Sequence, residues 1–204
     1  MSHYFDNNLT DKHLIDRVLH GDARAFGLIV KNTEGLVARI VFKMAGNPED
    51  RKDLAQDIYL KAYANLVHFK YQSKLSTWIA RIAYNTCLSF LEKRQLVLPG
   101  DLYEAAEPGE EGPGCPGAGL VIPRYQEAES LLFRKELSGI LQSEIEGLSP
   151  VFRTLITLYH HEELSYEEIG EITALPAGTI KSYLFRARKK LKDNLLTKFK
   201  KEEL

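Results

Sequence analysis

The chain has 204 residues, of which 44% are hydrophobic and 27% charged, with a formal net charge of −1. This length allows one large domain or two small ones, and the composition is that of an ordinary soluble protein. No stretch reaches the roughly 20 apolar residues of a membrane span. Because the N-terminus is polar and unlike a secretory signal, we expect a cytoplasmic protein without membrane insertion.

Helical periodicity dominates the first 95 residues. A short amphipathic set around Leu14 and Val18 is followed by Gly21-Asp22, which breaks one helix and caps the next. Asn47-Pro48 is another start signal, because Asn caps helices and Pro fits their first position. The apolar stripes are Phe26, Ile29, Val30, Val37, Ile40, Val41 and Met44, then Leu54, Ile58, Ala62 and Leu66, then Trp78, Ile82, Thr86 and Phe90. No segment alternates with period two, so we predict an all-α fold.

A stretch rich in glycine and proline divides the chain between Pro99 and Pro123. It contains no basic residue, and its acids are Asp101, Glu104, Glu107, Glu110 and Glu111. Prolines and glycines break helices and like charges repel, so this composition predicts a flexible linker. We therefore expect one helical domain over residues 1–96, a linker over 97–124 and a second helical domain over 125–204.

The C-terminal region predicts further helices, the last two of which form a helix-turn-helix. Ser149-Pro150 opens one helix, and Ser165 with Glu168 forms a capping box that opens a short one. A break at Ala174-Leu175-Pro176 leads to the last helix, whose apolar stripe is Ile180, Leu184, Ala187 and Leu191. A short capped helix, a tight break and a longer helix together make the helix-turn-helix pattern.

The last helix is strongly basic. From Pro176 to Lys201, nine basic residues and one acid give +8, so the rest of the chain sums to −9. A solvated helix face also explains such charge, but the cap and the break favour DNA over a plain helical hairpin. The residues placed to meet base edges are Lys181, Ser182, Phe185 and Arg186. Those placed nearer phosphates are Arg188, Lys189, Lys190 and Lys192.

Other classes of site lack support in the sequence. Cys87 and Cys115 are the only cysteines and form no paired motif, so neither a disulfide framework nor a cysteine-rich zinc site is expected. His160 and His161 are adjacent, but no third ligand lies at helical spacing from them. No Ser-His-Asp set and no phosphate-cradling glycine loop occurs. We therefore expect no enzyme activity, no cofactor and no metal.

Separate segments resemble bacterial sigma factors of the extracytoplasmic-function (ECF) group. The sequences LSYEEI at 164–169, PAGTIKS at 176–182 and FRAR at 185–188 resemble the promoter-reading domain four. DLAQDIY at 53–59 resembles the domain-two motif that docks on the RNA polymerase clamp, and STWIARIAYN at 76–85 resembles the segment that engages the −10 element. The resemblance covers nearly the whole chain outside the linker, with the motifs in the expected order.

The resemblance implies three sets of contact residues. For core polymerase they are Asp53, Leu54, Gln56, Asp57 and Tyr59. For the −10 element they are Lys70, Tyr71, Gln72, Ser73, Lys74, Ser76, Thr77, Arg81 and Asn85. For the −35 element they are Arg153, Ser165, Thr179, Lys181, Ser182, Phe185, Arg186, Arg188 and Lys189. Without the resemblance, the two aspartates would be interpreted as ordinary solvated helix acids.

Physical chemistry supports parts of these assignments. Lys70 and Lys74 suit backbone phosphates, and Tyr71 or Gln72 suits an extruded base, which proteins hold by stacking and edge hydrogen bonds. Trp78 lies on an apolar stripe, so we favour core packing over DNA contact for it.

Several residues depart from the family pattern. Ala174 and Glu163 stand where the family commonly has glycine, and an alanine in a left-handed turn costs about 1 kcal/mol. Tyr159 and His160 occupy a stretch that is often arginine in the family, which puts phosphate contacts there in doubt. Arg153 is the residue expected to compensate.

The sequence thus predicts an alternative sigma factor with two tethered helical domains. Its expected partners are the clamp and flap of core RNA polymerase, promoter DNA and an anti-sigma factor, which is a possible link to the membrane. The linker acids are expected to mimic nucleic acid near the RNA exit path. The alternative is a helix-turn-helix regulator that binds an operator without core polymerase, but it would need a dimerisation or ligand domain. A pure interaction module would not need the basic last helix.

Overall fold

The structure is a computed structural model that describes residues 2–95 and 127–202, with side chains over 11–94 and 137–198. Every regular element in these ranges is a helix, which confirms the predicted all-α class. The N-terminal unit comprises α1 (Ser2–Leu19), α2 (Ala23–Met44), α3 (Pro48–Asn65), the 3-10 turn η1 (Leu66–His68) and α4 (Leu75–Gln95). The C-terminal unit comprises α5 (Glu127–Glu146), α6 (Pro150–His160), α7 (Tyr166–Thr173) and α8 (Ala177–Glu202). The predicted linker, with its acids and Cys115, lies outside the described residues.

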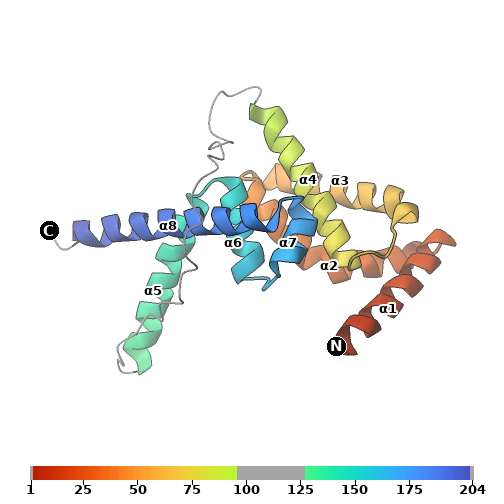
Figure 1. The fold of residues 1–204 in the computed structure, drawn as a ribbon, viewed down its shortest axis with the longest axis horizontal. Helices are drawn as coiled ribbons and strands as arrows, with labels where there is room; N and C mark the ends of the chain where they lie inside the picture. The colour runs from red at the N-terminus through yellow and green to blue at the C-terminus, as the bar shows by residue number, and fades with distance from the viewer. Residues whose placement is uncertain (1, 96–126, 203–204) are drawn as a thin grey trace.

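The predicted start signals of the N-terminal unit are confirmed. Gly21 has a φ of 93°, and Asp22 caps α2 by accepting from the backbone N–H of Arg24 at 2.9 Å. Asn47 caps α3 by accepting from the N–H of Glu49 at 3.0 Å, with Pro48 at the first helical position. The first helix is longer than the sequence predicted. The prediction was a short amphipathic segment around Leu14 and Val18, whereas α1 begins at Ser2. In this unit α2 packs against α1, α3 and α4, as Figure 1 shows.

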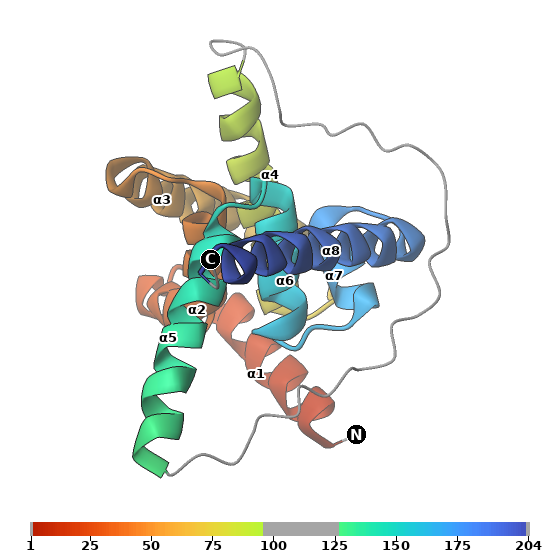
Figure 2. The ribbon, with the colours of Figure 1, turned by 90° about the vertical axis from the view of Figure 1, so that its left-hand side faces the viewer.

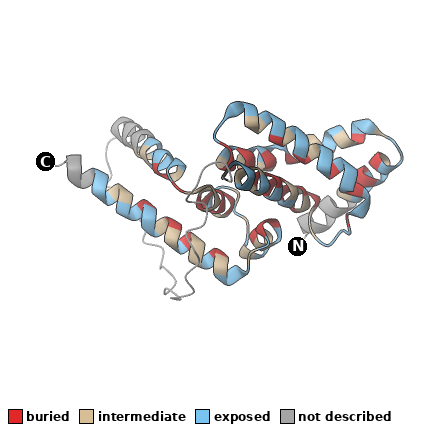
Figure 3. Ribbon diagram, turned by 90° about the horizontal axis from the view of Figure 1, so that it is seen from above, coloured by how far each residue is buried: buried red, intermediate tan, exposed pale blue. Residues whose placement is uncertain are grey.

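The helix-turn-helix is present in the C-terminal unit. The Ser165 hydroxyl accepts from the Glu168 N–H at 3.2 Å, and the Glu168 carboxylate accepts from the Ser165 N–H at 3.1 Å, so the capping box is confirmed. Ala174 ends α7 with a φ of 58°. The predicted stripe of α8 is buried, as Figure 3 illustrates for the buried and exposed sides of the helices. Figure 2 shows α8 crossing α6 and α7.

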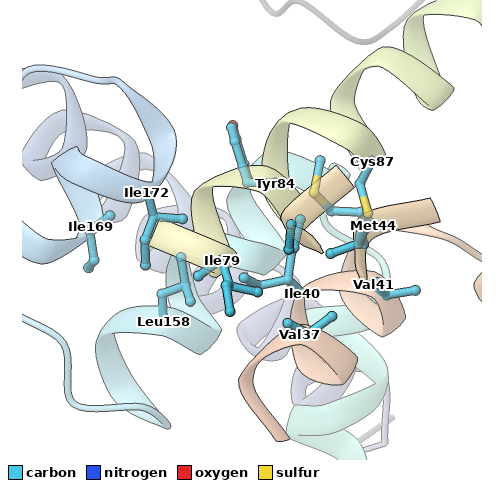
Figure 4. Close-up of a cluster of buried hydrophobic side chains, with 14 of the residues drawn as sticks. Val37, Ile40, Val41, Met44, Ile79, Tyr84, Cys87, Leu158, Ile169 and Ile172 are labelled. Atoms are coloured by element: carbon cyan, nitrogen blue, oxygen red, sulfur yellow. The ribbon is translucent and has the colours of Figure 1, made fainter. Parts of the chain in front are cut away.

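The two units are in contact, which the sequence did not predict. Helix α4 packs against α7, and α2 packs against α6. Figure 4 shows Ile40 of α2 and Ile79 of α4 in one cluster with Leu158 of α6 and Ile172 of α7. All four side chains are almost completely buried. A single contiguous hydrophobic core therefore runs through both units.

Candidate polymerase and DNA interfaces

The first predicted surface lies along α3. Asp53, Gln56 and Asp57 are exposed on one face of this helix, as the polymerase prediction requires. Leu54, predicted as part of the same surface, is only 6% exposed and belongs to the core stripe with Ile58. It supports the surface from beneath and does not lie on it.

Tyr59 and Asp57 already have partners within the chain. The hydroxyl of half-buried Tyr59 lies 3.1 Å from the hydroxyl of Thr33, and its ring meets that of Phe26 edge-on. Burial raises the pKa of Tyr59 despite the Thr33 hydrogen bond, so the phenol stays protonated. Asp57 pairs with Lys61 at 2.7 Å, with both side chains about half exposed. Tyr59 thus anchors α3 to α2, while Asp57 remains accessible.

Sequence reasoning missed an apolar continuation of this face. Leu60, Tyr63 and Val67 are 61%, 51% and 61% exposed, and they follow Asp53 and Gln56 at helical spacing. The sequence did contain a signal for their exposure. These three apolar residues do not belong to the stripe that was predicted to be buried, which is Leu54, Ile58, Ala62 and Leu66. An exposed patch that joins acid, amide and apolar groups is typical of a protein-binding surface.

The second predicted surface is the loop between η1 and α4. Tyr71 has a φ of 56°, which is unusual for a bulky residue, and its ring packs edge-on against Phe69. A pocket of about 340 Å³ opens beside this loop. Its lining residues are His68, Phe69, Lys70, Gln72, Ser73, Thr77, Trp78, Arg81 and Glu171. This volume is within the range of small-molecule sites.

The pocket brings together only part of the predicted −10 set. Five of its lining residues were predicted, namely Lys70, Gln72, Ser73, Thr77 and Arg81. Tyr71, Lys74, Ser76 and Asn85 do not line it, and Thr77 is largely buried. Trp78 forms part of the wall while packing on Phe69 at 5.3 Å between ring centroids. Glu171, which comes from α7, was not foreseen there.

The third predicted surface is the outer side of α8. Lys181 and Lys189 are exposed, Phe185 is 40% exposed, and Thr179, Ser182, Arg186 and Arg188 are partly exposed. Arg153 has partners within the chain. Its guanidinium donates to the backbone carbonyl of Glu146 at 2.9 Å and to the Glu146 carboxylate at 3.3 Å. Its side chain is only 16% exposed, and these bonds tie α6 to α5.

A stacked tyrosine pair supports two of the basic residues. The rings of Tyr159 and Tyr166 stack with centroids 5.1 Å apart and 10° between their planes. Arg188 lies 5.3 Å over the Tyr159 ring, and Lys181 lies 5.5 Å over the Tyr166 ring. Tyr159 thus holds a cation in the stretch where the family often has arginine, and Tyr166 holds a second one.

His160 also contacts Arg188. Arg188 Nε donates to Nε2 of exposed His160 at 3.2 Å. Partial desolvation of the ring, together with the positive charge of Arg188, lowers the pKa of His160 and favours the neutral ring that can accept this bond. Across the described side chains, no group of three histidine, cysteine, aspartate or glutamate residues is placed to hold a metal ion. No helix in the described ranges is long and apolar enough to span a membrane.

Comparison with known proteins identifies both units. Residues 29–97 match the family model "Sigma-70 region 2", and residues 138–191 match "Sigma-70, region 4". The chain is 36% identical over 180 residues to the ECF RNA polymerase sigma-E factor of Escherichia coli K12, which covers 88% of this chain and 91% of the relative. It is 34% identical over 184 residues to the ECF RNA polymerase sigma factor SigW of Bacillus subtilis 168, covering 90% and 96%.

Solved structures share the fold. The structure of CnrH in complex with the cytosolic domain of CnrY aligns with a TM-score of 0.58 and 20% identity, covering 92% of this chain and 98% of that one. The sigma factor RpoE of Bartonella quintana, solved with the anti-sigma factor NepR, also aligns with a TM-score of 0.58, at 22% identity over 85% and 98%. From the two ordered family matches and the relatives that span nearly its whole length, the chain belongs to the ECF group of RNA polymerase sigma factors.

Proposed function

We propose that this chain binds core RNA polymerase and directs promoter-specific transcription initiation by reading a −35 and a −10 element. The observation that carries this function is the ordered match to sigma regions 2 and 4 on two helical units. One unit offers a mixed acidic and apolar helix face, and the other offers a basic recognition helix. The helix-turn-helix regulator alternative accounts for the second unit alone.

In this proposal the exposed face of α3 docks on the polymerase clamp. Asp53, Gln56 and Asp57 supply the polar contacts, and Leu60 and Tyr63 extend them with apolar area. Buried apolar contacts stabilise a complex, while surface carboxylates steer it toward a basic partner. The C-terminal unit contacts the polymerase flap, so that both units are held on the enzyme.

The η1–α4 loop opens the duplex at the −10 element. The part of the pocket that the loop and α4 contribute accepts an extruded base, with Gln72 meeting its edge and Lys70 meeting the backbone phosphate. Holding a base outside the stack offsets the few kcal/mol lost on unstacking. Arg81 and Asn85, four residues apart and exposed on α4, continue the basic and polar surface along the strand.

The outer face of α8 enters the major groove of the −35 element. Lys181, Ser182, Phe185 and Arg186 lie at its N-terminal end, which is the part of a recognition helix that meets base edges. Arg188 and Lys189 lie further along and pair with phosphates, which gives affinity without sequence preference. The Tyr159–Tyr166 stack orients Lys181 and Arg188 for these contacts.

The proposal includes regulation and location. An anti-sigma factor holds the chain by covering these polymerase and DNA surfaces, and the chain works in the cytoplasm with polymerase, without catalytic activity of its own.

The acids at 101, 104, 107, 110 and 111 lie outside the described residues. Replacing all five with neutral residues should change the yield of initiation, and unchanged transcription would contradict a role for them.

The deciding experiment combines purified chain, core RNA polymerase and genomic promoter fragments. We expect a stable complex with core and run-off transcripts from specific start sites. Binding of an operator without core, and no transcript, would instead support the regulator alternative.

A matched pair of variants tests the two roles on α8. Arg186→Ala and Lys189→Ala remove one positive charge each. Arg186→Ala should weaken promoter binding by about 1–3 kcal/mol and relax preference at one base pair. Lys189→Ala should weaken binding to all sequences alike and reduce the slope of log affinity against log salt by about 1. Titration of labelled promoter fragments with the reconstituted holoenzyme at several salt concentrations measures both effects, and identical behaviour of the two variants would contradict the division of roles.

A further inference from the structure

The pocket beside the η1–α4 loop is lined by polar side chains from both units. Glu171 of α7 joins Lys70, Gln72 and Arg81 of the N-terminal unit in its lining. Within the part of the chain that the structure describes, none of these four side chains has a hydrogen bond or an ion pair. A cavity that gathers a few polar groups without partners is typical of a ligand site.

Packing on both sides of Glu171 fixes its place in the pocket wall. Glu168, one turn earlier on α7, pairs with Lys74 of the loop at 2.7 Å. Ile172, the next residue, is completely buried in one cluster with Ile79 of α4 (Figure 4). The backbone of α7 is therefore held beside the loop, and a helix presents the Glu171 carboxylate to the pocket.

Trp78 supplies an aromatic wall to the same pocket. Its partly exposed ring packs on Phe69, with 5.3 Å between the ring centroids. Bases stack on aromatic side chains of this kind whatever their identity, because every base has a planar π face. Trp78 is also the only tryptophan of the chain, so its fluorescence reports on this pocket.

The charged groups define the rest of the ligand. Lys70 and Arg81 are exposed cations that suit a phosphate. The Glu171 carboxylate only accepts hydrogen bonds when ionised, so it suits a group with two adjacent N–H donors. Guanine offers such an edge through its N1–H and its exocyclic amino group, whereas adenine has an acceptor at N1. The pocket volume of about 340 Å³ is near the lower end of the range for small-molecule sites, which suits a mononucleotide.

We propose that this pocket binds a free guanine mononucleotide. The base stacks on Trp78 and donates from N1–H and its amino group to Glu171, while Lys70 and Arg81 hold the phosphate. This site goes beyond promoter reading, because α7 supplies the residue that selects the base. A guanine within a promoter strand carries the same groups, but its flanking phosphates would bring further negative charge toward the acids of α7. The free nucleotide is therefore the favoured source.

Fluorescence of Trp78 in the full-length chain tests binding directly. Guanosine 5′-monophosphate (GMP) should quench the emission until the site is saturated. Guanosine, AMP and inorganic phosphate should each bind about tenfold more weakly or worse, because each lacks the phosphate, the donor edge or the base. Equal binding of AMP or of phosphate, or no quenching by GMP, would overturn the proposal.

A second titration distinguishes the two sources of guanine. A short oligothymidine with one central guanine should bind more weakly than GMP. Calorimetric titration of both ligands into the chain gives the two affinities. Tighter binding of the oligonucleotide would assign the pocket to a promoter strand and overturn the assignment to a free nucleotide.

A matched pair of variants on α7 tests the base edge. Glu171→Gln and Glu167→Gln each remove one exposed carboxylate, and Glu171, unlike Glu167, lines the pocket. Glu171→Gln should lower the preference for GMP over AMP about ten- to a hundredfold, because hydrogen bonds to a charged acceptor are lost. Glu167→Gln should leave the preference unchanged. A preference that survives Glu171→Gln, or falls equally in both variants, would contradict the role of Glu171.

A second pair on α4 tests the phosphate contact. Arg81→Ala and Lys93→Ala each remove one exposed cation, and Lys93 is not among the lining residues. Arg81→Ala should weaken GMP binding about tenfold and change guanosine binding little, while Lys93→Ala should change neither. An equal loss for guanosine and GMP would show that Arg81 does not hold the phosphate.

The nucleotide site and the proposed function fail in distinguishable ways, because the titrations contain neither polymerase nor promoter DNA. If GMP binds as expected but the chain directs no transcription with core polymerase, the nucleotide site stands and the sigma function falls. If transcription is promoter-specific while GMP leaves Trp78 fluorescence unchanged, the function stands and the nucleotide site falls.

Discussion

Ala174 has a left-handed backbone, with φ 58° and ψ 23°, at the turn between α7 and α8. The sequence predicted this strain, because glycine commonly stands there in sigma factors. Glu163 has a φ of 53°, so the second departure from glycine also falls on a left-handed residue. Tyr71 is a third such residue, and no sequence signal indicated it. Non-glycine residues pay about 1–2 kcal/mol for this conformation.

The first residue-scale prediction concerns this turn. Ala174→Gly should raise the free energy of unfolding by roughly 0.5–1 kcal/mol, since relief of the strain exceeds the added flexibility of the unfolded chain. Thermal or urea unfolding of the full chain measures the change. Ala64→Gly on the exposed face of α3 is the control, and it should destabilise by roughly 0.5–1 kcal/mol because its backbone is helical. Destabilisation by both variants would contradict the strain at Ala174.

At the scale of elements, the helix-turn-helix depends on a close approach at Gly170. A Cβ atom at this position would lie 3.1 Å from the carbonyl oxygen of Leu175, which belongs to the backbone of the turn. The capping box and the buried stripe of α8 were readable from residue types, because both are patterns within one segment. The close approach of α7 to the backbone of the turn could not be predicted from the sequence, because it depends on the three-dimensional path of the chain after the helix ends.

Gly170→Ala should therefore destabilise the helix-turn-helix by about 1–3 kcal/mol, as expected when a packed site receives an added methyl group. Gly27→Ala on α2 is the matched control. Apart from its chain neighbours and the nearby backbone of its own helix, no atom lies within 4 Å of its added Cβ, so it should stabilise by about 0.5–1 kcal/mol through helix propensity. Denaturant unfolding followed by circular dichroism compares the two, and equal effects would show that the turn tolerates the methyl group.

The shared core joins the two described units. Helices α2 and α4 of the N-terminal unit also bury side chains against α6 and α7, so unfolding one unit exposes apolar surface on the other. We expect a single cooperative transition in scanning calorimetry for the unaltered chain. Arg39 pairs with Glu162 and Lys43 with Glu146 of the C-terminal unit, so Arg39→Glu with Lys43→Glu should separate it into two transitions. Lys31→Glu, an exposed reversal on the same helix, should leave it single. Two transitions in the unaltered chain would mean that the units fold independently.

Much of the candidate site was predictable from sequence because its residues act through local position. The exposed faces of α3 and α8 followed from helical spacing, which places residues three or four apart on one side. Leu54 and Arg153 are less exposed than their predicted contact roles suggested, for a common reason. Their motif positions suggested contact with a partner, whereas the packing of α3 buries one and Glu146 pairs with the other.

The sequence by itself determined the helices, their caps, the helix-turn-helix and the family, because periodicity, capping pairs and motifs are properties of short segments. The tertiary structure alone decided that α7 lies against α4, that Glu168 pairs with Lys74 and that Glu171 reaches the loop pocket. These contacts join residues about 90 or more positions apart. No local pattern encodes such pairings, because they arise from the complementarity of two folded surfaces.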